Sequence, residues 1–154
     1  MVVFRIARNL YIRDLSGTGA KRYGGRWNAK GTAVLYTSRH RSLAILELLV
    51  NANIQTLPSD LSILKLEIPD LKNSSDISPS DLPDNWRSTP APFHLSHIGS
   101  EWITSGSSLT LTVPSVIVPE EQNLLINPNH PDFNQVKVES ISSFNVDSRF
   151  FKQT

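Results

Sequence analysis

The sequence predicts an α+β fold built mainly from short antiparallel strands with two or three helices. Two observations carry this prediction: six or seven short segments have the residue pattern of strands, and these segments do not alternate regularly with helices. Parallel strands need a long crossover between them, usually a helix, so the missing alternation favours antiparallel pairing. A chain of 154 residues is long enough to bury one core, and we expect a single domain over residues 1–154.

The strands are predicted from runs of β-branched and large apolar residues. In chain order they cover residues 2–6, 33–37, 63–68, 109–113, 116–118, 123–127 and 136–146. The segment at 63–68 alternates strictly, so one of its faces is expected in water. Pro114 and Ser115 interrupt the strand at 109–113, because proline cannot donate a hydrogen bond to a neighbouring strand. Phe144, Phe150 and Phe151 are expected to close the core.

Two helices are predicted, at 42–51 and 93–105. The first is apolar on nearly all sides and is therefore expected to be buried. The second places Ile98 and Trp102 on one side. Gly106 is its predicted end, because glycine readily adopts the left-handed conformation that terminates helices.

The remaining segments are predicted as loops and turns. Residues 14–25 are rich in small loop-forming residues, and a short helical turn is expected to begin at Pro131. Residues 70–92 contain many of the prolines and are expected to cross the surface irregularly. Trp86 is predicted to pack this excursion against the core.

Glu47 is the one charged residue in the apolar helix at 42–51. An ionised group leaves water at a high free-energy cost unless it is paired, hydrogen-bonded or open to a polar cleft. Helical spacing puts Asn51 one turn after Glu47 and His40 about two turns before it. Two interpretations stay open: this polar stripe faces solvent, or Glu47 projects into a functional site.

Charge is distributed unevenly along the chain. The net charge is +1, but residues 1–41 contain nine basic residues and only Asp14 as an acid, which gives +8 there and −7 for the remainder. This asymmetry indicates either an anionic ligand or two parts of the chain that attract each other on folding. A small phosphate-bearing ligand fits better than nucleic acid, because the acidic remainder opposes a broad basic face.

Composition disfavours several other classes of protein. The chain has no cysteine, which excludes disulfides and thiolate chemistry and points to a reducing cytoplasm. No apolar run approaches the length of a membrane span, and Arg5 interrupts the first apolar run too early for a signal peptide. We expect a soluble cytoplasmic protein that does not act at a membrane.

Common catalytic and cofactor motifs are missing. The spacing Gly17-x-Gly19 lacks the third glycine of a dinucleotide fingerprint, and neither a P-loop nor a GxSxG elbow is present. No paired carboxylates suggest ordinary glycoside hydrolysis. His94, His97 and Glu101 share a helical spacing, but no second pair of ligands stands out, so no metal site is predicted.

Four side chains remain as candidates for a site. Arg26 follows a glycine pair, and its guanidinium is suited to hold an anionic substrate or to pair with Glu47. Tyr36 either packs in the core or stacks on a ligand ring, and Ser115 either aims its hydroxyl into a cleft or is a turn residue. With Glu47, the set suits cleavage at the anomeric carbon of a phosphorylated ribose, where a carboxylate stabilises an oxocarbenium-like transition state.

Ordered motifs extend over nearly the whole chain. They are Gly24-Gly25-Arg26-Trp27-Asn28-x-x-Gly31, Leu35-Tyr36-Thr37-Ser38, Ser42-Leu43-Ala44-x-x-Glu47-Leu48-Leu49, Ile98-Gly99-x-x-Trp102, Val113-Pro114-Ser115 and Asn123-x-Leu125-Ile126-Asn127-Pro128-x-His130-Pro131-Asp132-Phe133. This combination resembles the RES-domain toxins of bacterial RES–Xre toxin–antitoxin modules. The family is named after an arginine, a glutamate and a serine, which fall here on Arg26, Glu47 and Ser115.

The resemblance implies an ADP-ribosyltransferase-like fold and an enzyme that consumes NAD as its substrate, without a separate cofactor, and so arrests growth. Arg26 would bind the phosphates or ribose of the dinucleotide, and Tyr36 would stack near the nicotinamide. Glu47 would hold the nicotinamide ribose and stabilise its cation, while Ser115 would form a hydrogen bond in the same pocket. Arg5 is a further expected phosphate contact.

The resemblance leaves the acceptor of the ADP-ribosyl group open. Water or phosphate would make the protein an NAD glycohydrolase or phosphorylase, whereas a protein side chain would make it a mono-ADP-ribosyltransferase. A third alternative is an inactive member that only binds its antitoxin. The implied partners are an Xre-family DNA-binding antitoxin that covers the cleft and a second toxin subunit in a homodimer, with no direct nucleic-acid contact.

Overall fold

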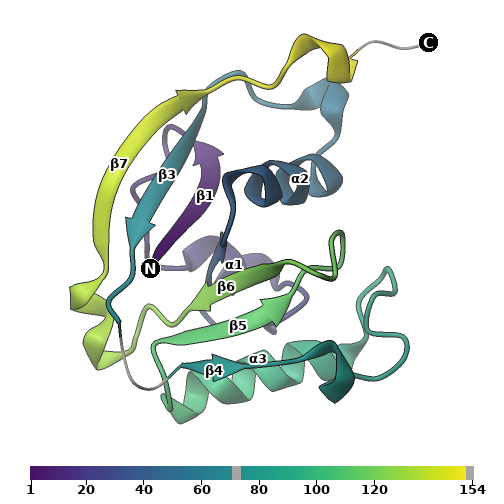
Figure 1. Cartoon of the computed structure of the whole chain (residues 1–154), viewed down its shortest axis with the longest axis vertical. Helices are drawn as coiled ribbons and strands as arrows, with labels where there is room; N and C mark the ends of the chain where they lie inside the picture. Colours follow the sequence, from purple (N-terminus) through teal and green to yellow (C-terminus); the bar gives the residue numbers. More distant parts are fainter. Residues whose placement is uncertain (71–73, 152–154) are drawn as a thin grey trace.

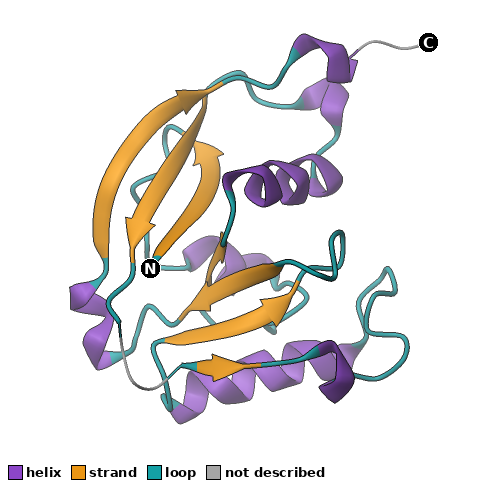
Figure 2. Cartoon of the chain, in the orientation of Figure 1, coloured by secondary structure: helices purple, strands orange, loops and turns teal. Residues whose placement is uncertain are grey.

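The computed structural model describes residues 1–70 and 74–151, and its strands and helices are shown in Figures 1 and 2. Within these residues there are seven strands, β1 (Val2–Arg8), β2 (Leu35–Ser38), β3 (Leu61–Glu67), β4 (Ser75–Asp76), β5 (Thr110–Pro114), β6 (Gln122–Ile126) and β7 (Lys137–Phe144), and three α-helices, α1 (Thr18–Tyr23), α2 (Arg41–Asn51) and α3 (Phe93–Ser105). The predicted α+β class is confirmed.

The strands form one sheet in the order β4-β5-β6-β2-β1-β3-β7. All neighbours are antiparallel except β4 and β5. The joint in the middle is short: β1 and β2 pair only at Phe4 and Ser38, whereas β1 pairs with β3 along its whole length. Figure 1 shows the result as two halves, with β1, β3 and β7 at the upper left and β4, β5 and β6 below.

Helix α2 contacts both β1 and β2 at this joint. Because the two strands separate after a single residue pair, an open space lies between them, and side chains of β1, β2 and α2 line it. The topology therefore places α2, with its carboxylate, at the point where the sheet opens.

Two hydrophobic clusters hold the fold together, and β6 contributes to both. Leu124 and Ile126 belong to one cluster with residues of β1 and β3, whereas Leu125 belongs to the other. Successive side chains of a strand point to opposite faces, so the clusters lie on opposite sides of the sheet. The second cluster packs α3 and the tryptophans Trp27 and Trp86 against β5 and β6.

Several predicted elements are confirmed. Helix α3 covers the predicted residues and ends at Gly106, which has a left-handed φ of 58°. Trp86 is buried, with 7% of its surface exposed, and packs the long excursion at 70–92 against the core as predicted. Residues 71–73 of that excursion lie outside the described residues. A short helical turn begins at Pro131 as expected.

One prediction about helicity is wrong. Residues 14–25, predicted as a loop, contain α1, whose Lys21 carbonyl accepts a hydrogen bond from Gly31 N–H at 2.8 Å. The donor of this hydrogen bond lies in the segment after the helix, so the residue pattern within the helix could not predict the bond. The wet face predicted for residues 63–68 is confirmed at Lys65, which is partly exposed, and at Glu67, which is exposed, whereas Ile63 on the same face is buried.

Three further predictions are wrong near the surface. Residues 116–118 form bends rather than a strand, because the N–H groups of Ile117 and Val118 donate to the Ser115 hydroxyl instead of to a neighbouring strand. Phe150 and Phe151 do not close the core, since they are 52% and 45% exposed in a terminal turn. Helix α2 is not buried on all sides either, because it buries only Leu43, Ala44 and Leu49.

No helix within the described ranges combines the length and the apolar character that a membrane crossing requires.

Candidate active site

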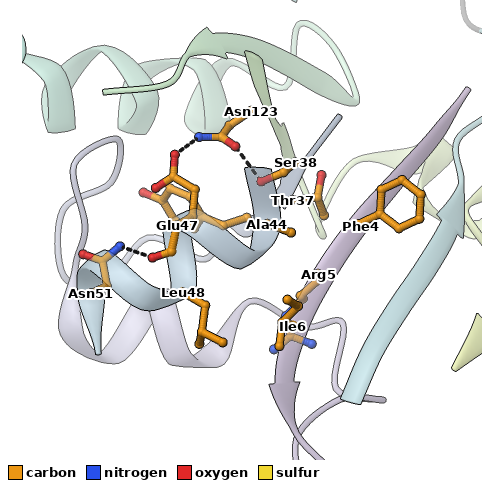
Figure 3. Close-up of a pocket in the computed structure, with 11 residues that line it drawn as sticks. Phe4, Arg5, Ile6, Thr37, Ser38, Ala44, Glu47, Leu48, Asn51 and Asn123 are labelled. Carbon is orange, nitrogen blue, oxygen red and sulfur yellow. Dashed lines mark hydrogen bonds between the residues drawn. The ribbon is translucent and has the colours of Figure 1, made fainter. Parts of the chain in front are cut away.

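A cleft lies where β1 and β2 separate, and it consists of two adjoining hollows. The smaller hollow, of about 280 Å³, is bounded by β1, β2 and α2 and is shown in Figure 3. The larger, of about 480 Å³, extends to the loop after α1, the loop before α3 and the loop after β5. Four side chains line both hollows: Tyr36, Glu47, Asn51 and Asn123. The cleft is therefore organised around the carboxylate that the sequence singled out.

Glu47 reaches the cleft from α2 and is held by two donors. Its Oε1 accepts hydrogen bonds from Asn123 Nδ2 at 2.6 Å and from Ser115 Oγ at 3.0 Å. Figure 3 shows the carboxylate turned toward Asn123. Within the described part of the chain, Oε2 accepts no hydrogen bond. One oxygen is thus fixed by the protein while the other is available to a ligand.

The predicted polar stripe of α2 divides at this point. Glu47 and Asn51 line the cleft, and Asn51 Nδ2 donates to the backbone carbonyl of Glu47 at 2.9 Å. His40 does not line either hollow and instead forms the N-cap position of the helix.

Ser115 acts on Glu47 from inside the protein. Its side chain has no exposed surface, and its Oγ accepts hydrogen bonds from the N–H groups of Ile117 at 3.1 Å and Val118 at 3.2 Å. With both acceptor positions used, the single hydroxyl proton is directed at the Glu47 carboxylate. Ser115 does not line the cleft, so its position is that of a residue that orients Glu47.

Arg26 lines the larger hollow and is hydrogen-bonded to the loop before α3. Its Nη1 donates to the Trp86 carbonyl at 2.7 Å and its Nη2 donates to the Ser88 carbonyl at 3.1 Å. Burial lowers the pKa of Arg26, and the nearby Glu47 carboxylate and Tyr36 partly offset this. No salt bridge joins Arg26 to Glu47 in the described residues. Both charges therefore face the cleft without neutralising each other in direct contact.

Tyr36 stands between the two hollows, and its hydroxyl is fully engaged. It donates to Asn28 Oδ1 at 2.7 Å and accepts from the Trp27 N–H at 3.1 Å. Burial raises the pKa of Tyr36, so the phenol stays neutral. A side chain at Gly25 would place its Cβ 2.8 Å from this hydroxyl, which explains why the loop carries glycine there. Tyr36 thus fixes the loop that carries Arg26.

Arg5 lines the smaller hollow from β1. Its Nη1 donates to three backbone carbonyls, those of Tyr11 at 3.3 Å, Ile12 at 3.2 Å and Asp14 at 3.1 Å. Burial lowers the pKa of Arg5, and the charge of Asp14 opposes this shift. Each hollow consequently has one guanidinium, and Glu47 lies between them.

Comparison with known proteins identifies the family. The family model of the RES domain matches residues 2–147 of the sequence, which include every candidate residue above. The chain belongs to the RES-domain family. The resemblance inferred from the sequence motifs is confirmed.

Two named proteins are close relatives of this RES domain. It is 46% identical over 134 residues to Toxin Res of Yersinia enterocolitica, with 86% of this chain and 88% of that protein covered. It is 42% identical over 149 residues to the Prs ADP-ribosylating toxin of Sphingobium sp., with 96% of this chain and 92% of that protein covered.

One solved structure has a similar fold. It is the crystal structure of the M. tuberculosis MbcT–MbcA toxin–antitoxin complex, in which one chain superposes with a TM-score of 0.76 at 16% identity, over 93% of this RES domain and 83% of that chain. At this identity the likeness concerns the fold alone. The predicted α+β fold with mainly antiparallel short strands is confirmed, and one chain of that complex shares it.

Two polar residues of the RES domain belong to the site but were not assigned from the sequence. Asn123 on β6 donates to Glu47 and accepts from Ser38 Oγ at 2.6 Å, and the two residues face each other in the pairing of β2 with β6. The available signal was Asn123, because asparagine is uncommon in strands, whereas Ser38 at the end of β2 gave no comparable signal. Only the strand register shows that they are neighbours.

Histidine does not contribute to a metal site in the described part of the RES domain. No group of three or more His, Cys, Asp or Glu side chains is arranged there to hold a metal ion. His97 and Glu101 approach each other at 3.1 Å on the exposed face of α3. They form a surface pair.

Proposed function

We propose that this RES domain is the toxin of a toxin–antitoxin module and that it cleaves the bond between nicotinamide and ribose in NAD. The observation that carries the proposal is the Glu47 carboxylate, which Ser115 and Asn123 hold in a cleft with an arginine in each hollow. NAD has the matching features: an anionic pyrophosphate and a ribose that becomes cationic when nicotinamide leaves.

The reaction needs charge stabilisation more than proton transfer. The bond between ribose C1′ and the nicotinamide nitrogen breaks, both electrons stay with nicotinamide, and the ribose becomes an oxocarbenium ion. A fixed carboxylate near this cation stabilises the transition state, because its orientation is already set before reaction. Glu47 has that role here, with Oε1 held by the protein and Oε2 open to the ribose.

The two arginines supply the binding of phosphate. A guanidinium binds phosphate oxygens through paired N–H groups, and both Arg5 and Arg26 line the cleft. Each also donates to backbone carbonyls, so these side chains are ordered before the substrate arrives. Preordering reduces the entropy lost on binding. We assign the ring of Tyr36, which borders both hollows, to packing against the nicotinamide.

The relatives support this proposal. The protein 46% identical to this chain is named a toxin, and the one 42% identical is named an ADP-ribosylating toxin. Water as the acceptor would yield ADP-ribose and a proton, phosphate would yield a phosphorylated ADP-ribose, and a protein side chain would become ADP-ribosylated. The name of the second relative favours transfer to a protein as the alternative function.

The proposal includes partners and a setting. The structural neighbour was crystallised as a toxin–antitoxin complex, which supports an antitoxin that binds this chain. We propose an Xre-type DNA-binding antitoxin that covers the cleft, a homodimer of the toxin within the complex, and action on the NAD pool of the cytoplasm.

Purified protein incubated with NAD alone tests the reaction. Release of nicotinamide together with ADP-ribose supports hydrolysis, and release of a phosphorylated product only in phosphate buffer supports phosphorolysis. Turnover that appears only with a protein acceptor, which becomes labelled, supports transfer. The variant Glu47→Gln keeps the shape of the side chain without its charge and should lower the rate at least about 100-fold. Equal nicotinamide release by wild type and Glu47→Gln would refute the proposal.

A further inference from the structure

We propose that Gly99 and Ser100 of α3 are positioning residues for Arg26, because they hold the backbone of the loop at 24–31 that carries it. This inference rests on the proposed function, since it assigns these two residues a role in the same reaction. Neither residue lines the cleft. Gly99 belongs to the motif Ile98-Gly99-x-x-Trp102, which the description of the cleft leaves unexplained.

Gly99 brings α3 into direct backbone contact with the loop. A Cβ added at Gly99 would lie 1.8 Å from the Trp27 carbonyl oxygen and 2.8 Å from the Trp27 carbonyl carbon. Gly99 is buried on the same face of α3 as Leu95 and Trp102. Any other residue at this position would therefore force the helix and the loop apart.

Ser100 adds a directional contact to the same loop. Its Oγ accepts a hydrogen bond from the Ala29 N–H at 3.0 Å. Other hydroxyl residues of α3, such as Ser96 and Thr104, donate to carbonyls of their own helix instead. Two consecutive residues of α3 thus hold the loop at Trp27 and at Ala29.

The loop is held from a second side by Tyr36. The Trp27 N–H donates to the Tyr36 hydroxyl, while the Trp27 carbonyl rests against Gly99. Both backbone groups of Trp27 are therefore fixed, and Arg26 is the residue directly before it. Relaxing the Gly99→Ala clash from 1.8 Å to an ordinary 3.4 Å contact would move Trp27 or α3 by more than 1 Å. A displacement of about 1 Å can lower an enzymatic rate on the order of 100-fold.

The first experiment compares matched variants of the full chain. We expect Gly99→Ala to lower kcat/KM for NAD on the order of 100-fold and Ser100→Ala to lower it about fivefold, the effect of one lost hydrogen bond. Gly19→Ala is the control for the first, because an added Cβ meets no atom within 4 Å there. Ser96→Ala is the control for the second, because the Ser96 hydroxyl bonds only within its helix. Both controls should stay within twofold of wild type, and thermal melting should show all four variants folded.

A double-mutant cycle separates positioning from general stabilisation. If Gly99 and Ser100 act through Arg26, their substitutions should change kcat/KM less than twofold when Arg26 is already alanine. If each substitution lowers the rate by the same factor in the Arg26→Ala background as in wild type, the inference is overturned. Because Ser100→Ala creates no clash, the cycle stays informative even if Gly99→Ala fails to fold.

Amide hydrogen exchange tests the same inference without using NAD. Ser100→Ala should speed exchange of the Ala29 N–H at least about fivefold, since its acceptor is lost, whereas Ser96→Ala should not. Unchanged exchange at Ala29 overturns the inference whatever the enzyme does. If wild type releases no nicotinamide, the proposed function fails, and the exchange result still decides whether α3 holds the loop.

Discussion

Asn123→Ala is the perturbation that examines the site most directly. Asn123 joins two hydrogen bonds of 2.6 Å: its Nδ2 donates to Glu47 Oε1, and its Oδ1 accepts from Ser38 Oγ. The substitution removes both bonds and leaves the Ser115 hydroxyl as the single donor to the Glu47 carboxylate within the described residues. No atom of Glu47 itself is changed, so any loss of rate reports on how the carboxylate is held.

The magnitude follows from the charge on the acceptor. A hydrogen bond to a charged group contributes about 1.5–3 kcal/mol, and each 1.4 kcal/mol corresponds to a tenfold change in rate. We therefore expect kcat/KM for NAD to fall about 10- to 150-fold. Because Glu47 acts on the charge that develops in the transition state, most of the loss should appear in kcat rather than in KM.

The assay is nicotinamide release at low and at saturating NAD concentrations, corrected for the folded fraction from thermal melting. Asn127→Ala is the matched control. Asn127 is more buried than Asn123 and also makes side-chain hydrogen bonds, to the Ile103 carbonyl and from the Asn129 N–H, but it does not line the cleft. This control should keep kcat within about twofold of wild type even where its melting temperature falls.

Two results would refute the reasoning. The first is an Asn123→Ala enzyme with wild-type kcat while Glu47→Ala is inactive, which would mean that the carboxylate needs no orientation by Asn123. The second is an equal loss of kcat in Asn123→Ala and Asn127→Ala, which would assign the effect to general destabilisation.

Three further predictions concern stability and binding. Burial raises the pKa of Tyr36 above that of an unfolded tyrosine, about 10, so the neutral phenol stabilises the fold fully below pH 10 and less as pH rises above it. The difference in unfolding free energy between wild type and Tyr36→Phe, measured in urea, should therefore shrink by up to about 1.4 kcal/mol per pH unit above pH 10. A difference that stays constant with pH would contradict this. Arg5→Lys keeps the positive charge but loses the planar guanidinium with its paired N–H donors, so KM for NAD should rise about tenfold with little change in kcat. An unchanged KM would exclude Arg5 from phosphate binding. Leu125→Ala, at a site with no exposed surface, should lower the free energy of unfolding by about 2–5 kcal/mol, whereas Leu10→Ala, at a residue 75% exposed, should change it by less than about 0.5 kcal/mol.

Local patterns were sufficient to predict most elements. The strand at 123–127 and the helix at 93–105 follow from spacing alone, because side-chain periodicity reports which face is buried. Gly106 ended the helix as expected, since the left-handed backbone at its end favours glycine. The ordered motifs around Arg26, Glu47 and Ser115 identified the family.

Contacts between distant residues were decided only by the tertiary structure. The hydroxyl of Ser115 reaches Glu47 across 68 positions, and Arg26 reaches the Ser88 carbonyl across 62, so no local spacing could reveal either bond. Asn123 joined the site because the register of β2 and β6 sets it opposite Ser38. A sequence determines where a side chain points relative to its own helix or strand, whereas the partner it meets depends on how separate elements pack, and that is a property of the whole fold.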